Sequence, residues 1–440
     1  MRPLARRQFL AALAAAAVLP RWARAQPTNP DVVVIGAGAA GIAACRRLAA
    51  EGLSFLLLEA KDRIGGRAFT DATRFGIPFD HGCSWLHQSD RNPLTGFARD
   101  AGYTLLPHDG ELEQVYVGSR RASDPELTVY GENWDRMRRT LMALGAAGKD
   151  VAPETALPTD NPWMALCKAW EGPLSLGADF DQFSALDWYT LESTKPNLMV
   201  REGMGTLVSL IGRDLPVSLS TPVDRIAWGG SGVEVTTPKG TIQAKAAILT
   251  VSTGVLQAER IAFDPPLPAA KLRAIDGLPM GLLAKIPLEF DGERFGVPAN
   301  YWLSYKPESE RLCYSLAWPF GSNLMIPFVG GRFGWALSRD GEATAIDFAL
   351  GELEKMFGSA VRRHFVRGGF TPWANDPDVL GAYAHSMPGH IDARQALGLP
   401  LDDRLFFAGE ATAGGYAMTC GGAFRSGERA AAEAAQALHA

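Results

Sequence analysis

The chain has 440 residues, of which 47% are hydrophobic and 21% are charged, and its formal net charge is −5. This length suits two domains, or one large domain with an insert, and the composition is that of a globular protein rather than a disordered one. The moderately acidic balance argues against nucleic acid as a partner and weakly favours a cationic substrate. The five cysteines lack the spacing of a metal site, so no metal is expected, and their odd number leaves at least one thiol unpaired.

The first 25 residues predict an export signal. Arg6 and Arg7 precede the apolar stretch 11–19, and a small-x-small site after it predicts cleavage before Gln26. The adjacent arginines are typical of the twin-arginine route, which exports folded proteins. The apolar stretch is too short to cross a hydrocarbon core of about 30 Å as a helix, so we expect no stable membrane anchor. We therefore expect the twin-arginine machinery as a partner and a periplasmic or secreted location. Cleavage removes five arginines and no acids, which moves the formal charge from −5 to −10.

A βαβ unit is predicted directly after this segment. The apolar run 31–35 has the pattern of a strand buried on both faces, 42–50 favours a helix, and the run 55–58 predicts a second strand that ends in Glu59. A GxGxxG turn joins the first strand to the helix, which indicates a dinucleotide-binding unit. By itself this unit does not show whether the bound dinucleotide is FAD or NAD.

Each part of the turn has a physical role. Gly36 makes the tight turn, Gly38 lets the backbone approach a pyrophosphate, and Gly41 lets the helix pack close to the strand. The carboxylate after the second strand can accept hydrogen bonds from a ribose. The residues expected to hold the dinucleotide here are Gly36, Gly38, Ala39, Ala40, Gly41, Glu59 and Ala60.

Two arginines flank a glycine pair in the next segment, 63–70. Guanidinium groups can pair with phosphate oxygens, and glycines allow close backbone contact. The residues expected at the phosphates are Arg63, Gly65, Gly66 and Arg67. Taken alone, the segment also fits a basic surface loop.

With this segment the chain resembles the flavin amine oxidase family, whose second motif has the form RxGGRxxT after the ribose-binding acid. The family includes monoamine oxidases, polyamine oxidases, L-amino acid oxidases and histone lysine demethylases. The resemblance implies FAD as the cofactor.

The C-terminal segment 405–435 carries a second part of this resemblance. An apolar run ends in Gly409 and Glu410, and Gly422 lies at the start of a predicted helix. Read alone, this arrangement fits one more βα unit of a Rossmann sheet equally well. The match to the family's C-terminal motif implies that Glu410 contacts the ribityl–pyrophosphate region and that Gly422 lies near the isoalloxazine. In the same way, Val223 matches a residue whose backbone meets the adenine, within a predicted run of short alternating strands over 222–251.

The residues expected to carry the chemistry also come from the resemblance. Lys285 lies in a predicted apolar strand over 280–288, and the residues alone fit an edge-strand lysine with its ammonium in water. Its match to the family's MGxxxK segment implies a hydrogen bond to a water beside flavin N5. Tyr383 matches the tyrosine of the family's amine cage and Trp373 matches the tryptophan near the flavin, although core packing explains either residue when it is read alone.

Two departures qualify the match. Ala382 stands where monoamine oxidases carry the cysteine that links to FAD, so non-covalent attachment is expected. Thr419 aligns with their second cage tyrosine, which leaves half of the cage, although Tyr416 is a candidate to complete it.

The segment 79–87 is expected to form another wall of the site. It resembles the GxS/TWxH segment of spermine and polyamine oxidases, whose histidine faces the substrate. This implies contributions from Gly82, Cys83, Ser84, Trp85 and His87. A histidine with an ordinary pKa near 6.5 can bond an amine and help to select its neutral form.

The expected fold is α/β: a Rossmann-like FAD-binding domain of the amine oxidase type with an inserted α+β substrate domain. We expect the FAD-binding domain to comprise residues 29–93, 198–289 and 371–440, and the substrate domain to comprise residues 94–197 and 290–370. The expected function is FAD-dependent oxidation of an amine, with a polyamine or diamine favoured, and with O2 or a periplasmic electron acceptor reoxidising the flavin. Alternatives are an L-amino acid oxidase, an amine dehydrogenase that uses a cytochrome, a C–C desaturase, and a non-catalytic flavoprotein. The residues do not predict an oligomeric state.

Overall fold

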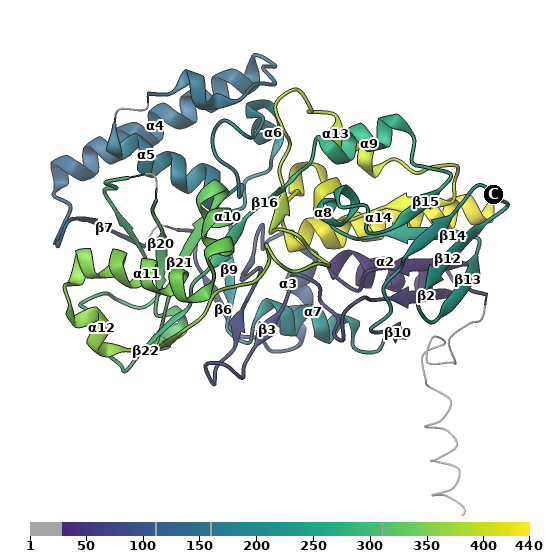
Figure 1. The fold of residues 1–440 in the computed structure, drawn as a ribbon, viewed down its shortest axis with the longest axis horizontal. Helices are drawn as coiled ribbons and strands as arrows, with labels where there is room; N and C mark the ends of the chain where they lie inside the picture. Colours follow the sequence, from purple (N-terminus) through teal and green to yellow (C-terminus); the bar gives the residue numbers. More distant parts are fainter. Residues whose placement is uncertain (1–28, 111, 159–160, 310) are drawn as a thin grey trace, which may run out of the picture.

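The computed structural model describes residues 29–440 except 111, 159–160 and 310, so the predicted export signal lies outside the described residues. Figure 1 shows the chain in two halves. The right half contains a parallel sheet with helices α2 and α14, and the left half contains a larger sheet with helices α4, α5, α11 and α12. Within the described ranges, no helix is long and apolar enough to cross a membrane.

The sheet of the right half has five parallel strands, as the βαβ pattern predicts. Their order is β10 (Val217–Ser218), β2 (Phe55–Leu58), β1 (Val32–Ile35), β14 (Ala246–Leu249) and β24 (Leu405–Phe407). The four longer strands are completely buried, which explains their continuous apolar sequences. The stretch 246–249 was expected among the alternating strands, but it pairs with β1 inside this sheet because both of its faces are apolar.

Helices α2 (Ala39–Ala50) and α14 (Cys420–His439) pack against each other on one face of this sheet. Small residues make this close approach feasible: a Cβ on Gly427 would lie 2.0 Å from the carbonyl oxygen of Ala40. Helices from the two ends of the described chain are therefore in direct contact. Helices α3 (Pro93–Asp100) and α7 (Met204–Gly212) lie beside them.

The other face is covered by a four-stranded sheet with short helices. The order is β13 (Gly240–Ala244), β12 (Val233–Thr237), β11 (Arg225–Ala227) and β15 (Ala262–Asp264). The short helices are α8 (Thr253–Gln257), α9 (Ala269–Asp276) and α13 (Ala393–Gly398). Alternate residues of β1 point into the two separate hydrophobic clusters that these layers form.

The left half is built on an eight-stranded mixed sheet. Its strands are β7 (Glu113–Val117), β8 (Arg120–Arg121), β17 (Leu283–Lys285), β18 (Leu288–Phe290), β19 (Tyr301–Tyr305), β20 (Tyr314–Ala317), β21 (Leu324–Gly330) and β22 (Phe365–Gly368). All pairs are antiparallel except β7 with β19. The helices of this half are α4 (Asp124–Ala146), α5 (Pro162–Ala169), α6 (Ala185–Thr190), α10 (Gly331–Asp340), α11 (Glu342–Phe357) and α12 (Ala360–His364). A π-helical turn, η2 (Trp170–Leu174), follows α5.

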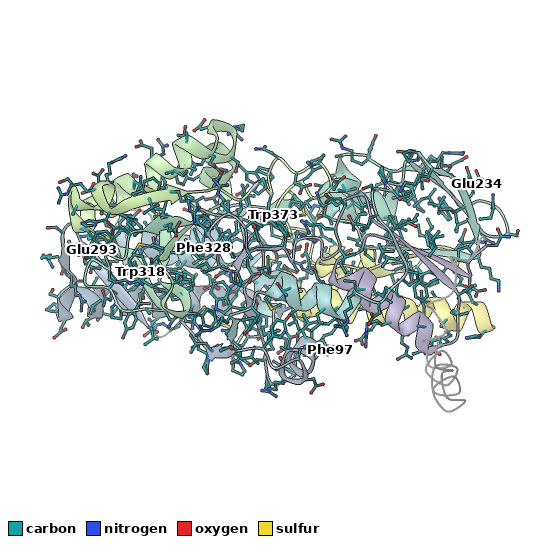
Figure 2. All side chains as sticks on the ribbon, turned by 90° about the horizontal axis from the view of Figure 1, so that it is seen from below. Phe97, Glu234, Glu293, Trp318, Phe328 and Trp373 are labelled. Carbon is teal, nitrogen blue, oxygen red and sulfur yellow. The ribbon has the colours of Figure 1, made fainter. Side chains whose placement is uncertain are left out.

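Three small sheets lie between these layers. They are β3 (Thr70–Asp71) with β4 (Phe79–Asp80), β16 (Met280–Gly281) with β23 (Tyr383–Ala384), and β5 (Trp85–Leu86) with β9 (Leu198–Val200) and β6 (Leu105–Pro107). Short helical turns η1 (Pro153–Ala156), η3 (Pro319–Gly321), η4 (Glu410–Thr412) and η5 (Gly414–Tyr416) complete the chain. In Figure 2 Trp373 lies between the half that contains Trp318 and the half that contains Glu234.

The single strand expected over 280–288 is three short strands instead. The chain leaves β16, enters the large sheet at β17 and continues into β18. Pro287 lacks the N–H that an unbroken ladder needs at this point, which separates β17 from β18. The expected domain boundary at 289 therefore falls inside β18, and residues 283–289 pair with the sheet of the left half.

Candidate active site

The glycine turn after β1 forms a cradle at the start of α2. Gly36 has a φ of +101°, and a Cβ on Gly41 would lie 1.9 Å from the carbonyl oxygen of Gly36, so the close approach of helix and strand requires a glycine there. Gly38 is the N-cap of α2 and gives the helix no side-chain acceptor. The first N–H groups of Ala39, Ala40 and Gly41 are therefore available to an anion.

The second glycine pair closes against this cradle. Gly38 and Gly65 form an isolated parallel bridge, and a Cβ on Gly66 would lie 3.2 Å from the Cα of Gly38. Arg63 donates to the carbonyl of Gly66 (2.9 Å), and its guanidinium lies 4.0 Å from the centre of the Phe69 ring. Arg63 therefore supports the loop as well as adding positive charge beside the cradle.

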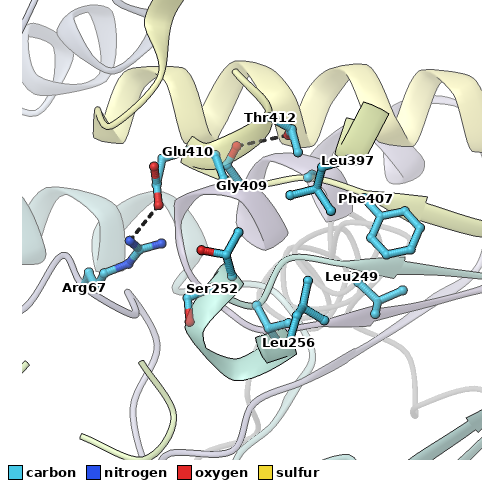
Figure 3. Close-up of a pocket in the computed structure, with 13 residues that line it drawn as sticks. Arg67, Leu249, Ser252, Leu256, Leu397, Phe407, Gly409, Glu410 and Thr412 are labelled. Atoms are coloured by element: carbon cyan, nitrogen blue, oxygen red, sulfur yellow. Dashed lines mark hydrogen bonds and ion pairs between the residues drawn. The ribbon is translucent and has the colours of Figure 1, made fainter. Parts of the chain in front are cut away.

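Arg67 joins the two ends of the sequence. Its guanidinium donates to the carboxylate of Glu410 (2.9 Å) and to the carbonyl of Ala382 (2.7 Å), as Figure 3 shows for the first contact. The backbone N–H of Ala384 donates to the same carboxylate (3.1 Å). A small cavity beside this ion pair is lined by the carboxyl ends of β14 and β24, with Leu249, Ser252, Phe407 and Gly409 among its residues.

Glu59 lies at the end of β2, as expected, and is buried. One carboxylate oxygen accepts from the N–H of Ala37 (2.7 Å) and the other from the N–H of Lys61 (2.9 Å). Burial raises the pKa of Glu59. Ala60 continues the chain beside it, and Val223 is buried in the cluster on the opposite face of the sheet. Glu59 therefore lies next to the glycine cradle, since it binds the N–H of Ala37 within the glycine turn.

These residues fit a flavin dinucleotide. A Cβ on Gly38 would meet only the Cα of Gly66 (3.9 Å) and the carbonyl oxygen of Gly65 (4.0 Å), so the cradle leaves room there. It lies where β1, β14 and β24 end at one edge of the sheet. In an open parallel sheet, this edge is where dinucleotides bind. The helix N-terminus, the arginines and the buried carboxylate supply the donors and acceptors that a pyrophosphate and a ribose need.

Lys285 is buried in β17 and is only 4% exposed. Its ammonium donates to the carbonyls of Asp80 (2.7 Å) and Gly82 (2.6 Å) and to the hydroxyl of Ser84 (2.6 Å). The alternative of an edge-strand lysine with its ammonium in water is therefore wrong. Burial lowers the pKa of Lys285 to about 8. Because all three N–H groups are used, the water contact expected from the resemblance requires one acceptor to be exchanged.

Trp373 holds the same loop from another direction. It is buried, its indole N–H donates to the carbonyl of His81 (2.8 Å), and its ring lies 3.5 Å from the position that a Cβ on Gly82 would take. Lys285 and Trp373 thus bind three successive carbonyls, those of residues 80, 81 and 82. The structure brings together the two predicted site residues and the predicted wall through this loop.

Tyr383 lies on β23 and its hydroxyl donates to the carbonyl of Leu174 (3.0 Å), at the end of η2. Burial raises the pKa of Tyr383, which keeps the phenol neutral. The residue before it is Ala382, so no thiol is present at this position. Tyr383 therefore connects the two halves of the molecule.

His87 and its neighbours form the end of the predicted wall. The Nδ1 atom of His87 lies 2.6 Å from the side-chain oxygen of Asn197, and its ring is stacked on Trp85 with 6.5 Å between centroids. Burial lowers the pKa of His87, so its imidazole is neutral at neutral pH. A hydrogen bond with Cys420 raises the pKa of the Cys83 thiol in the same wall.

Thr419 lies at the start of helix α14. Its hydroxyl accepts from the N–H of Gly422 (2.9 Å) and donates to the carbonyl of Tyr416 (2.8 Å), so it caps α14. The Tyr416 ring lies 5.6 Å from the guanidinium of Arg91 and 4.7 Å from that of Arg425. The Tyr416 ring therefore packs with two arginines, and its place in the cage stays a prediction.

Asp80 and Asn197 were missed by sequence reasoning. The carboxylate of Asp80 accepts from the hydroxyl of Thr70 (2.6 Å) and from the N–H of Met204 (3.0 Å) at the start of α7, and burial raises its pKa. In the sequence, the position of Asp80 directly after the apolar Phe79 is a weak signal that its carboxylate is a buried hydrogen-bond acceptor. However, the partner helix begins more than a hundred residues later, so only the fold identifies it.

Comparisons with known proteins agree with this geometry. The family model for flavin containing amine oxidoreductases matches residues 177–435, and that for an NAD(P)-binding Rossmann-like domain matches 34–101. Polyamine oxidase 3 of Oryza sativa subsp. japonica is 31% identical over 93% of this chain and 90% of its own length. Probable polyamine oxidase 4 of Arabidopsis thaliana is 30% identical over 91% of this chain and 86% of its own length.

Solved structures show the same fold. Cyclohexylamine oxidase from Brevibacterium oxydans superposes with a TM-score of 0.76 at 24% identity, covering 94% of this chain and 100% of its own. Wild-type putrescine oxidase bound to putrescine superposes with a TM-score of 0.76 at 22% identity, covering 92% of this chain and 98% of its own. The family model and these relatives span most of the described fold, and the chain belongs to the flavin containing amine oxidoreductases.

Proposed function

We propose that this enzyme oxidises a diamine or polyamine with a non-covalently bound FAD, giving an imine that hydrolyses to an aldehyde and an amine. When bound, FAD supplies the acceptor for the hydride equivalents of the substrate α-carbon, and O2 then takes the electrons and yields H2O2. Non-covalent attachment follows from Ala382, which has no nucleophile.

The observation that carries the substrate class is a buried acid in the turn that binds the Tyr383 hydroxyl. Glu171 lies in η2, the same turn whose Leu174 carbonyl binds the Tyr383 hydroxyl. The carboxylate accepts from the indole N–H of Trp188 (2.6 Å), and burial raises the pKa of Glu171. A buried carboxylate with a raised pKa is stabilised by a cation, and aromatic faces also favour one. A second, protonated nitrogen of the substrate would supply that cation.

The other residues have complementary tasks. Tyr383 and Trp373 offer aromatic faces that exclude water around the reacting amine, and the neutral imidazole of His87 accepts a hydrogen bond from it. Lys285 fixes the loop 80–84 and, by exchanging the Ser84 hydroxyl, can hold a water for imine hydrolysis. The polyamine oxidases among the relatives support this substrate class.

We also propose a division of labour within the chain. Residues 29–93, 198–289 and 371–440 would hold the FAD, and 94–197 with 290–370 would form the substrate side, with 283–289 joining the latter by sheet pairing. Export by the twin-arginine route, to the periplasm or the medium, is proposed from residues 1–25 alone.

The substrate class is tested by flavin bleaching. The purified holoenzyme is mixed anaerobically with putrescine, spermidine, a simple monoamine or an L-amino acid, and the loss of flavin absorbance is followed. We expect the first two to bleach the flavin fastest, and Glu171→Gln to raise the concentration of spermidine needed for half-maximal reduction by roughly tenfold or more while affecting the monoamine little. Bleaching by L-amino acids but not by spermidine would make the substrate proposal wrong. Readmission of O2 tests the acceptor, because slow reoxidation would favour a cytochrome.

A further inference from the structure

A buried ion pair connects helix α6 of the left half to α13 of the right half. The guanidinium of Arg394 donates from Nε to Oδ1 of Asp187 (2.8 Å) and from NH2 to Oδ2 (2.9 Å), and both residues are 5% exposed. Such a bidentate pair is geometrically specific. Taking both charges out of water is costly, so a buried pair is weak support for stability alone. Its contacts point to a different role.

The same guanidinium binds the backbone next to two site residues. It donates to the carbonyl of Ala384 (3.2 Å), which follows Tyr383, and to the carbonyl of Ala411 (3.3 Å), which follows Glu410. The N–H of Ala384 in turn donates to the Glu410 carboxylate. Arg394 therefore fixes the backbone directly after Tyr383 and directly after Glu410.

Asp187 leads back to the same tyrosine through the left half. The next residue of α6, Trp188, donates to Glu171 in η2, and the Leu174 carbonyl of that turn accepts from the Tyr383 hydroxyl. These contacts form a closed ring around Tyr383. The hydroxyl of Tyr383 is held by the left half, the backbone of the next residue, Ala384, is held by Arg394, and Asp187 joins the two anchors.

We propose that Arg394 and Asp187 are positioning residues for amine oxidation, which set the place of the Tyr383 ring relative to the flavin. This inference rests on the proposed position of Tyr383 beside the flavin. Neither charged group needs to contact substrate. A displacement of about 1 Å in a reacting arrangement can cost on the order of a hundredfold in rate. Loosening the contacts that hold Tyr383 would therefore slow flavin reduction.

The test is the limiting rate constant of flavin reduction, measured anaerobically with spermidine and divided by the bound FAD. Asp187→Asn and Arg394→Lys are expected to lower it between roughly tenfold and a hundredfold. The matched control is Asp181→Asn, which breaks the exposed pair of Asp181 with Arg332 (2.6 and 2.8 Å) and should change the rate by less than about twofold. If Asp187→Asn does not fold, Asp187→Asn with Arg394→Gln removes both charges and permits the same measurement.

A double-variant cycle separates positioning from general stability. If Arg394 acts through the Tyr383 ring, Arg394→Lys combined with Tyr383→Leu, which removes that ring, will be no slower than the slower single variant. Multiplicative effects on the rate would overturn the proposal. So would variants that melt at lower temperature but reduce their flavin at the wild-type rate, while Tyr383→Leu still slows reduction and the proposed function stands. A wild-type rate for Tyr383→Leu would overturn both this proposal and the proposed role of Tyr383, while the substrate class is decided by the flavin-bleaching test.

Discussion

At the scale of single residues, burial of Lys285 gives a pH-dependent prediction. Its pKa falls from 10.5 to about 8, so between these values the unfolded chain binds more protons at this residue than the folded chain does. The contribution of Lys285 to the free energy of unfolding therefore rises with pH across that window, and Lys285→Met should lack this rise. Chemical denaturation of both proteins between pH 7 and 10.5 measures it.

The same residue gives a prediction for turnover. Above about pH 8 the neutral amine has two N–H groups for the three acceptors in residues 80–84. Lys285→Met removes all three bonds, so flavin reoxidation or imine hydrolysis should slow by about tenfold or more, and the inflection of the wild-type rate near pH 8 should disappear. If the Lys285→Met variant reduced and reoxidised its flavin at the wild-type rates, Lys285 would have no part in the mechanism. Lys245→Met, which changes an exposed ion pair, is the control.

At the scale of elements, the contact of α2 with α14 sets the cradle. A Cβ on Gly427 would lie 2.0 Å from the Ala40 carbonyl oxygen, and backbone cannot yield as a flexible side chain does. Gly427→Ala should therefore separate the helices, cost about 1–3 kcal/mol of stability and weaken FAD retention. Thermal melting and the flavin-to-protein ratio measure both effects. Gly131→Ala in α4, where a Cβ meets nothing within 4 Å, should leave FAD bound and stabilise the helix by up to about 1 kcal/mol.

At the scale of the whole molecule, FAD is expected to depend on the complete fold. The Arg67–Glu410 pair brings together segments from opposite ends of the chain, so no single segment contains the site. Acid precipitation should leave all of the flavin in the supernatant, because no covalent link holds it to the unfolded chain. Added FAD should raise the melting temperature of the stripped enzyme with its concentration, as ligand binding to the folded state requires. Flavin in the precipitate would contradict the non-covalent attachment.

The sequence by itself determined the local features of this protein. The buried strands β1 and β2, the glycine turn and the second arginine–glycine segment follow from patterns within about 40 residues, where backbone sterics and hydrophobic periodicity decide the structure. The motif resemblance also indicated the family, which the comparisons confirm.

Only the tertiary structure decided which side chains meet. It showed that Lys285 binds three acceptors of residues 80–84, that Thr419 caps a helix, and that Arg394 finds Asp187 across the two halves. These partners are separated by tens to hundreds of residues, and their pairing depends on how the sheets are arranged rather than on any local pattern. A buried donor must find an acceptor, but the sequence does not say where that acceptor lies.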